Sequence, residues 1–552
     1  MKKTLVLILI LVGSIAAFLI VLPFLVNQYL NRNAERIVSN MITRTNDFAG
    51  HKVSFGDIHL DYDYRGTYLK MDSVDIRPGE ELDPDKKIRF HLTFDEASLT
   101  GFRWVDFLFL NSIQLDSAYI ENVVLETITP DLDEMQADQQ PAGSDKGEDY
   151  QVIGLNHLRV NKVSFENRDS QTDSVRLSLT DLFVFADGFR LDREDRERSD
   201  ALFSVESIEG YLANAQVHLN NSLNVVEARD LSFNTRDQRL IVEEISFLNK
   251  LRKYAYVNRF EKETNWMELT DARMQLDGMD FQAYFREGTI SADTLRLEGL
   301  DLDVFRDKRK VEDTSKRPKM IHEILEGLPR KLHLPVIAFS DIRITYEERP
   351  ETKAPTAGKI FFDRVEGEIS GFSTVGETSA QTDTLRVSAR GRLMGQGQID
   401  LQADHLINDG KGTFFLKGSV GAMNLPLLND MIMPATRVAL KSGRLNDLFF
   451  DIRANDLEGT GQVIARYEDL EIEILDKNFK RNQNAFRRIG AFLANKVVIR
   501  TQNPKKSGDL SKGAVYFERE KHKFVFHYWW NLVLSGLKST ITGQTEEEMR
   551  EK

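Results

Sequence analysis

Apolar and polar residues alternate with period 2 along most of the chain from Val53 onward. The segment 385–391 (LRVSARG), for example, places apolar side chains on one face of a strand and polar ones on the other. Strands of this kind bury one face only. The alternation therefore predicts a mainly β protein, with an elongated, twisted and antiparallel-rich β array.

Helical spacing is confined to a few segments, which predict short helices that cap the array. They lie at 248–263, 319–328, 424–433, 478–494 and 528–538.

One eight-residue pattern recurs, with apolar residues at positions 0, 2, 5 and 7 and a polar pair in between. It occurs at 69–76, 92–99, 118–125, 158–165, 177–184, 226–233, 240–247, 274–281, 295–302 and 337–344. Composition alone predicts about five copies. In a flat strand, the three-residue step from position 2 to position 5 would place the apolar residues at positions 5 and 7 on the opposite face from those at positions 0 and 2. A β-bulge at the polar pair restores one apolar face, and we favour it over a strand that changes its buried side and over a short hairpin.

The first residues differ from the rest of the chain. Met1, Lys2 and Lys3 precede an uncharged apolar run at 5–26, which has the length of a transmembrane helix and exceeds a cleavable signal core. We predict an uncleaved signal anchor at 1–27 and a stalk helix at 28–50, with removal of a long secretory signal as the alternative. The remaining chain is then expected on the outer side of the membrane, which is the periplasm if the cell has two membranes.

Composition excludes several functional classes. Lys and Arg total 73 against 86 Asp and Glu, and the net charge of −13 argues against a nucleic-acid partner. The absence of cysteine excludes disulfides, thiolate metal sites and cysteine nucleophiles. The β region is expected at 51–350 and 351–545, the latter with capping helices, before a polar tail at 546–552.

Searches for chemistry give only weak matches. The segment 459–465 fits a dinucleotide fingerprint formally, but a strand follows it where a phosphate-binding helix is needed. The match to S-x-x-K at 535–538 lacks its partner motifs. His522 and His527 lie in a strand-like segment without metal-ligand spacing. The carboxylates of 301, 303 and 307 are expected to face solvent. No catalytic, cofactor or metal site is predicted, and the chain is not expected to be an enzyme.

The architecture and several phrases resemble the AsmA/TamB-like family of membrane-anchored periplasmic proteins. The phrases lie at 113–127, 295–310, 328–349 and 437–475, and the last contains a Tyr-x-Asp-Leu sequence that ends at Leu470. The resemblance implies a repeating β-groove with an apolar inner face. It also implies a role in moving lipids between the inner and outer membranes, and in outer-membrane assembly, without catalytic residues.

The apolar positions of the recurring pattern are the candidate lining of a lipid groove, with closed sandwich core as the alternative for each. They are Leu69, Met71, Val74, Ile76, Leu295, Leu297, Leu300, Leu302, Ile337, Phe339, Ile342 and Ile344. The basic and aromatic segment 477–496 is a candidate for contact with anionic lipid headgroups through Arg487, Arg488 and Phe492, or a cap over the sheet end. Residues 528–530 (YWW) suit either a membrane interface or the core, and we favour the core.

These features predict a protein that binds or conducts phospholipid or glycolipid in maintenance of the cell envelope. Outer-membrane assembly proteins are possible partners. An envelope scaffold that binds proteins and never holds lipid is the alternative. A third interpretation, a polysaccharide-acting β-solenoid enzyme, lacks a fixed repeat and a convergent acid–base pair.

Overall fold

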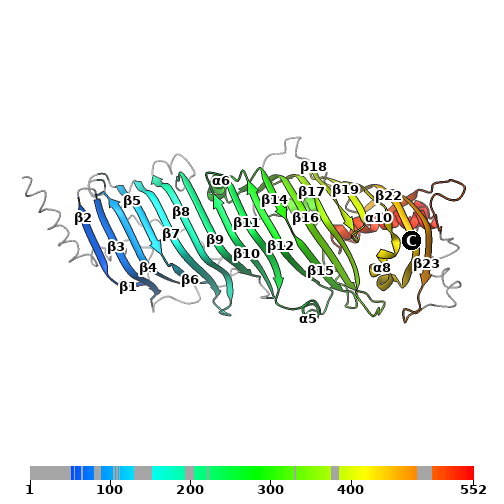
Figure 1. Ribbon diagram of the computed structural model, residues 1–552, viewed down its shortest axis with the longest axis horizontal. Helices are drawn as coiled ribbons and strands as arrows, with labels where there is room; N and C mark the ends of the chain where they lie inside the picture. Colours follow the sequence, from blue (N-terminus) through cyan, green and yellow to red (C-terminus); the bar gives the residue numbers. More distant parts are fainter. Residues whose placement is uncertain are drawn as a thin grey trace, which may run out of the picture. The chain divides into compact units, whose positions relative to one another are not determined.

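The computed structural model describes residues 51–551, apart from 55, 64–65, 80–88, 104–105, 107–109, 111, 130–151, 193–203, 220–222, 329–330, 375–383 and 481–499. Over the described residues the chain is mainly β. Its 24 strands form one large, mixed and mostly antiparallel sheet, and the helices are few and mostly short (Figure 1). The predicted mainly β class is confirmed.

The predicted anchor at 1–27 and stalk helix at 28–50 lie outside the described residues. Within the described part of the chain, no helix is long and apolar enough to span a bilayer.

The chain divides into two compact units. Unit 1 contains residues up to Ser222 together with Val226–Val242, and unit 2 contains Leu223–Val225 and the residues from Glu243 onward. The strands of unit 1 are β1 (His51–Ser54), β2 (Ile58–Asp63), β3 (Gly66–Pro78), β4 (Arg89–Phe102), β5 (Ser112–Glu121), β6 (Val124–Thr129), β7 (Val152–Asp169), β8 (Val175–Asp192), β9 (Ser207–His218), most of β10 (Asn224–Asn234) and the start of β11 (Arg239–Asn249).

Unit 2 contains the other strands and all the named helices. Its strands are β12 (Asn265–Asp277), β13 (Ile290–Ser291), β14 (Thr294–Glu298), β15 (Asp301–Asp307), β16 (Leu332–Arg349), β17 (Gly358–Ser373), β18 (Thr384–Leu393), β19 (Gly397–Leu406), β20 (Phe414–Val420), β21 (Met423–Asn424), β22 (Val438–Ala454), β23 (Glu458–Ile474) and β24 (Gly513–Glu518). Its helices are α5 (Lys253–Val257), α6 (Phe281–Glu287), α7 (Ile321–Glu326), the 3₁₀ turn η2 (Leu425–Leu428), α8 (Asn429–Thr436), α10 (Val525–Thr542) and α11 (Glu546–Arg550).

In both units, long strands pair with two shorter strands that lie end to end. β1 and β2 both pair antiparallel with β3. β5 and β6 pair antiparallel with β4 and parallel with β7. In unit 2, β14 and β15 pair antiparallel with β12 and parallel with β16. From β16 to β20, and from β22 to β24, consecutive strands are antiparallel, and β20 pairs directly with β22.

The polar pair of the recurring pattern is a point of local backbone distortion, as predicted. In eight of the ten copies the second polar residue has a left-handed φ; these residues are Ser73, Asn122, Lys162, Asp181, Asp230, Gly278, Gly299 and Asp341. At Lys162 and Asp341 the register between neighbouring strands shifts, which is the expected β-bulge. At Asn122 and Gly299 the same distortion ends one strand, and the next begins along the same neighbour.

Because each bulge adds one residue, the apolar positions before and after it return to one face of the sheet. The copy at 274–281 is an exception. There the chain leaves the sheet at Gly278, and Asp280 caps α6 by accepting a hydrogen bond from the backbone N–H of Ala283 at 2.9 Å.

Most helix predictions correspond to helices in unit 2. The segment 319–328 contains α7, the segment 424–433 overlaps η2 and α8, and the segment 528–538 lies within α10, whereas 481–494 lies outside the described residues. The predicted helix at 248–263 is confirmed only over the short α5 at Lys253–Val257, because β11 continues to Asn249 and residues 258–263 are not helical. The side-chain amide of Asn249 donates to the carbonyl of Met267 on β12, so contact with a neighbouring strand overrides the helical spacing.

The strand-like interpretation of 522–527 is also wrong, since α10 begins at Val525. Val525 is buried in the large core of unit 2, beneath the helix. Burial of this side chain on the sheet fixes the first turn of α10. The buried residues 525, 528, 529 and 532 then follow helical spacing and not the alternation expected of a strand.

Candidate apolar binding face

Rows of apolar side chains cross the sheet of unit 1 on one face. Residues that are directly paired point to the same face, so the strand register defines each row. One row joins Leu60, Leu69, Leu99, Ala118, Leu158 and Ala186 across six strands. A second, on the other side of the bulges, joins Val53, Ile76, Leu92, Leu125, Phe165 and Leu179.

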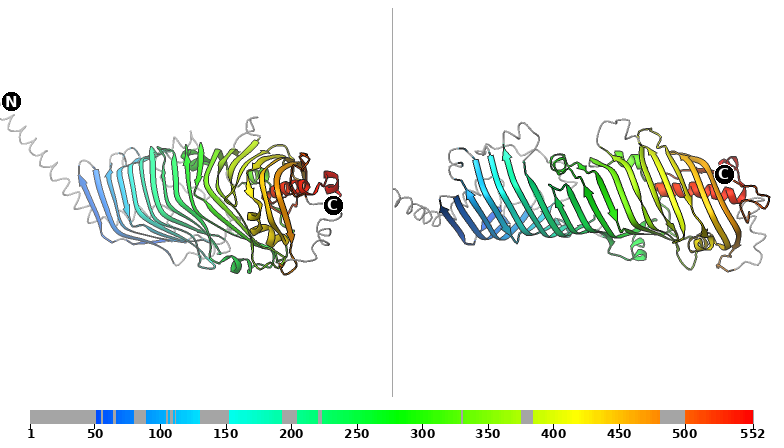
Figure 2. Two further views of the ribbon diagram at one scale, coloured as in Figure 1. Left: turned by 45° about the vertical axis from the view of Figure 1, so that its right-hand side comes forward. Right: turned by 45° about the horizontal axis from the view of Figure 1, so that its top comes forward.

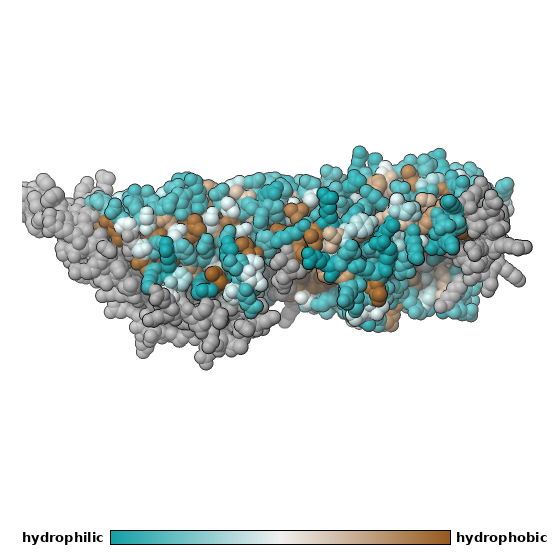
Figure 3. Space-filling view, turned by 90° about the horizontal axis from the view of Figure 1, so that it is seen from below, coloured by the Kyte–Doolittle hydropathy of each residue, from teal (hydrophilic) through white to brown (hydrophobic). Residues whose placement is uncertain are grey.

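The elements named from β1 to β11 are all strands, so no named helix covers these rows in unit 1. Val74 and Ile76 are buried among their neighbours, whereas Leu69 and Met71 are half-buried. Apolar side chains are visible among polar ones over the strands of unit 1 in the view from below (Figure 3). Unit 1 therefore has an apolar sheet face that no described helix closes.

The candidate residues of unit 2 lie side by side on three adjacent strands. Leu295 pairs with Ile337, Leu297 with Phe339, and Leu302 with Ile344. Leu300 lies in the break between β14 and β15, where its carbonyl accepts a hydrogen bond of 2.8 Å from the backbone N–H of Arg343. Ile342 sits at the bulge and pairs with Val365. The register thus brings together the eight candidates that lie between 295 and 344.

Each of these rows continues toward the C-terminal strands and becomes more deeply buried there. The row through Leu295 and Ile337 continues through Ile369, Val387, Ala403, Leu416 and Ile452. Leu295, Leu297 and Leu302 are half-buried, whereas Leu416 and Ile452 are each only 1% exposed. One continuous apolar face is therefore only half-buried at the other candidates of β14–β16, although Ile337 is already buried at 7% exposure, and it is closed at β20–β22.

Helices account for the closed part. Tyr528, Trp529 and Leu532 of α10 are buried in the large core of unit 2, together with Phe414 and Leu416. Both views in Figure 2 show α10, in red, lying against the C-terminal strands. Gly536 permits the close approach, because a Cβ there would meet the Val463 side chain at 2.4 Å. The preference for core packing at 528–530 is thus correct for two of the three residues, since Trp530 is 44% exposed.

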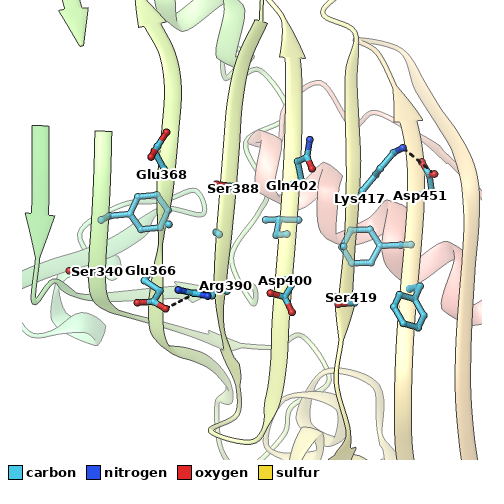
Figure 4. Close-up of a pocket in the computed structure, with 17 residues that line it drawn as sticks. Ser340, Glu366, Glu368, Ser388, Arg390, Asp400, Gln402, Lys417, Ser419 and Asp451 are labelled. Atoms are coloured by element: carbon cyan, nitrogen blue, oxygen red, sulfur yellow. Dashed lines mark hydrogen bonds and ion pairs between the residues drawn. The ribbon is translucent and has the colours of Figure 1, made fainter. Parts of the chain in front are cut away.

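The opposite face of these strands is polar. Two ladders of side chains cross β16–β22 and leave between them a shallow groove of about 860 Å³ (Figure 4). Within the ladders, Arg390 Nε donates to Glu366 Oε1 at 2.6 Å, and Lys417 forms an ion pair with Asp451 at 3.4 Å. Across β16–β22 the sheet therefore has one apolar and one charged face, as the alternation predicts. At β12 and β15, by contrast, the face opposite Leu302 carries a small apolar cluster, in which Trp266 and Phe305 are buried with Tyr256 and Val257 of α5.

Burial shifts the pKa of several groups near the closed end. It lowers the pKa of the His405 and His527 side chains to about 4 and raises that of Tyr467 to about 12. Desolvation also raises the pKa of Asp456, although His322 and Arg519 beside it act in the opposite direction. Among the described residues, no group of three or more potential ligands is placed to hold a metal ion.

The weak chemical matches have structural explanations. Residues 459–465 lie within β23, as predicted, and no helix begins there. The Ser535 hydroxyl donates to the Leu532 carbonyl at 2.8 Å and contacts the edge of β24. Asp303 is exposed, but the expectation for Asp307 is wrong. Its buried carboxylate accepts two hydrogen bonds from the Arg309 guanidinium at 2.6 and 2.8 Å, and this pairing compensates its burial.

Arg487, Arg488 and Phe492 lie outside the described residues. The candidate list also left out row members such as Leu92, Leu125 and Leu158, although the recurring pattern marks them in the copies at 92–99, 118–125 and 158–165. Applying the pattern to all ten copies would have found them. No protein-family model matches the chain, and no curated protein matches it either.

Proposed function

We propose that the protein is a non-catalytic, membrane-anchored periplasmic protein that binds or conducts lipids between membranes during envelope biogenesis and maintenance. The observation that carries this proposal is the set of apolar rows in unit 1, which cross at least six strands without a described helix over them.

The dimensions of the apolar face suit an acyl chain. Eight residues of strand extend about 26 Å at 3.3 Å per residue. Covering the face with a lipid tail is favourable by about 0.8 kcal/mol for each CH₂ group removed from water. The charged face of β16–β22 would remain in water, so in this part of unit 2 a tail has one side of the sheet on which to bind.

The location and partners belong to the same proposal. The uncharged run at 5–26 would anchor the chain in the inner membrane, with the strands in the periplasm. The resemblance to the AsmA/TamB-like family supports a lipid cargo and a role beside outer-membrane assembly proteins. The identity of the lipid, a phospholipid or a glycolipid, is left open.

Mass spectrometry of the detergent-solubilised full chain tests the proposal. We expect phospholipid or glycolipid to remain with the protein after extensive washing in detergent. A sample that is folded and free of lipid, and that takes up none when phospholipid is added, would contradict it.

A non-catalytic scaffold is the second candidate, and the charged groove across β16–β22 favours it. Ladders of paired charges can select a protein partner of complementary charge. Binding of outer-membrane assembly factors to lipid-free protein, with loss of binding in Arg390→Glu, would support this role.

A further inference from the structure

Helix α10 carries apolar side chains on two faces, but the sheet covers only one. Val525, Tyr528, Trp529 and Leu532 are buried against the strands. Phe526 and Trp530, four residues apart and therefore on one face of the helix, are 62% and 44% exposed. A helix that only closed the core would need one apolar stripe, with polar residues opposite.

Phe526 belongs to a continuous aromatic cluster, and Trp530 lies one helical turn from it on α10. The Phe526 ring packs edge-on against Trp529 with centroids 5.3 Å apart, and its centroid is 5.6 Å from that of Phe524. Phe524, which precedes the helix, is 45% exposed. The nearest cation in sequence, Lys523, is paired with Glu312, so its charge is balanced. The result is an exposed aromatic patch that the core does not use.

The register shows on which side of the sheet this patch lies. The row that begins at Leu297 and Phe339 continues through Gly367, Ala389, Leu401, Gly418, Phe450 and Val463. Its last member, Val463, lies directly beneath Gly536 of α10. The helix therefore packs on the same face as the candidate groove residues. Phe526 and Trp530, on the exposed side of this helix, therefore lie on the same side of the sheet as the candidate groove.

We propose that Phe526 and Trp530 form the end wall of the apolar groove in unit 2 and contact the acyl chain of a bound lipid. This inference rests on the proposed function. The apolar row is partly open at β14–β16 and closed beneath α10, so a tail lying along the row must stop where the helix begins. Aromatic rings at that point offer the tail a further apolar surface and limit how far it extends.

Tryptophan fluorescence tests the contact directly. The chain has four tryptophans, at 104, 266, 529 and 530, and of the last three only Trp530 is exposed. Full-length protein in detergent is loaded with phosphatidylethanolamine brominated in its acyl chains, and unbound lipid is removed by gel filtration. Bromine quenches indole emission at short range, so we expect loaded wild type to lose emission relative to protein loaded with unbrominated lipid. Trp530→Phe should remove the quenched component.

The matched control is Trp529→Phe, which removes the buried neighbour and should leave the quenching in place; circular dichroism checks that the variant is folded. If Trp530→Phe binds lipid and its emission is quenched as much as that of wild type, the end-wall inference is wrong, while the proposed function stands. Failure to load any lipid would overturn both. Quenching that appears only with brominated vesicles, and not in the loaded and purified protein, would place Trp530 in a bilayer instead and overturn the inference.

Discussion

The backbone N–H of Ala514 donates a hydrogen bond to the Ser539 hydroxyl at 2.9 Å. Ala514 lies on β24, which pairs with β23, and Ser539 lies on α10. One turn earlier in the helix, Ser535 Oγ accepts the N–H of Tyr516 on the same strand at 3.3 Å. Exposed strand edges recruit other strands, and natural proteins cover them. Here two helix hydroxyls satisfy the outward N–H groups of the strand.

Ser539→Ala should destabilise unit 2 by about 1–3 kcal/mol, because it leaves the partly buried N–H of Ala514 without an acceptor. The substitution also removes the bond that the Ser539 hydroxyl donates to the carbonyl of Gln544 at 2.6 Å. Urea unfolding measures the loss, and hydrogen exchange should accelerate at Ala514. The adjacent exposed substitution Lys538→Ala is the control; an equal effect of the two variants would contradict the role of the hydroxyl.

The bulge at Asp341 makes a prediction about backbone strain. Its φ of 52° is in the left-handed region, where a β-branched residue is strongly disfavoured. Asp341→Val should cost about 1–3 kcal/mol of unfolding free energy, whereas Asp341→Gly should be tolerated. Chemical denaturation compares both with Asp303→Val, which alters an exposed carboxylate in regular strand β15. If the two valine variants are equally stable, the bulge does not constrain the side chain.

Side-chain periodicity explains why much of the fold could be predicted. Val163 and Phe165 follow a polar pair that ends at Lys162, and the local requirement for one apolar face indicates the bulge there before any partner strand is known. The parallel pairing of β5 and β6 with β7 carries no such local sign, because it depends on strands brought together from separate parts of the chain.

The same limit explains the errors around α10 and α5. Trp529 and Trp530 are adjacent and chemically identical, yet one is buried and the other exposed, because the phase of the helix on the sheet separates them. At Asn249 the surrounding sequence has helical spacing, yet the residue belongs to strand β11. Its side-chain amide bonds to the carbonyl of Met267 on another strand, β12. In each case the deciding contact is made by residues distant in sequence.

A charge introduced into the apolar face should discriminate a lipid groove from a closed core. Leu297→Asp places a carboxylate at a half-buried position where water can solvate it when lipid is absent. A bound tail would remove that water at a cost of several kcal/mol. We therefore expect less phospholipid per protein by phosphorus assay, with an unchanged circular dichroism spectrum.

Ser388→Asp is the control for that substitution, because Ser388 is exposed on the charged face of β18. It should retain as much lipid as wild type. Unfolding of Leu297→Asp would indicate that Leu297 belongs to a closed core, and equal lipid retention in the two variants would indicate that lipid does not bind this face.

The buried His405 should make the stability of unit 2 depend on pH. Its ring stacks on Phe414 and Trp529, with centroids 5.1 and 5.6 Å away, and burial lowers its pKa to about 4 from 6.5. The folded state therefore binds fewer protons than the unfolded state between these values. The contribution of neutral His405 to the free energy of unfolding is fully present above pH 6.5. It is lost as the pH falls toward 4, by about 3 kcal/mol at most.

His405→Phe should flatten this dependence, because phenylalanine can occupy the stack and has no proton to bind. Urea midpoints measured at intervals from pH 7 to pH 4 give the test. Some slope should remain, since burial lowers the pKa of His527 to about 4 as well. His59→Phe, at an exposed position in unit 1, should leave the wild-type slope unchanged. A slope in His405→Phe equal to that of wild type would show that the acid sensitivity of unit 2 arises elsewhere.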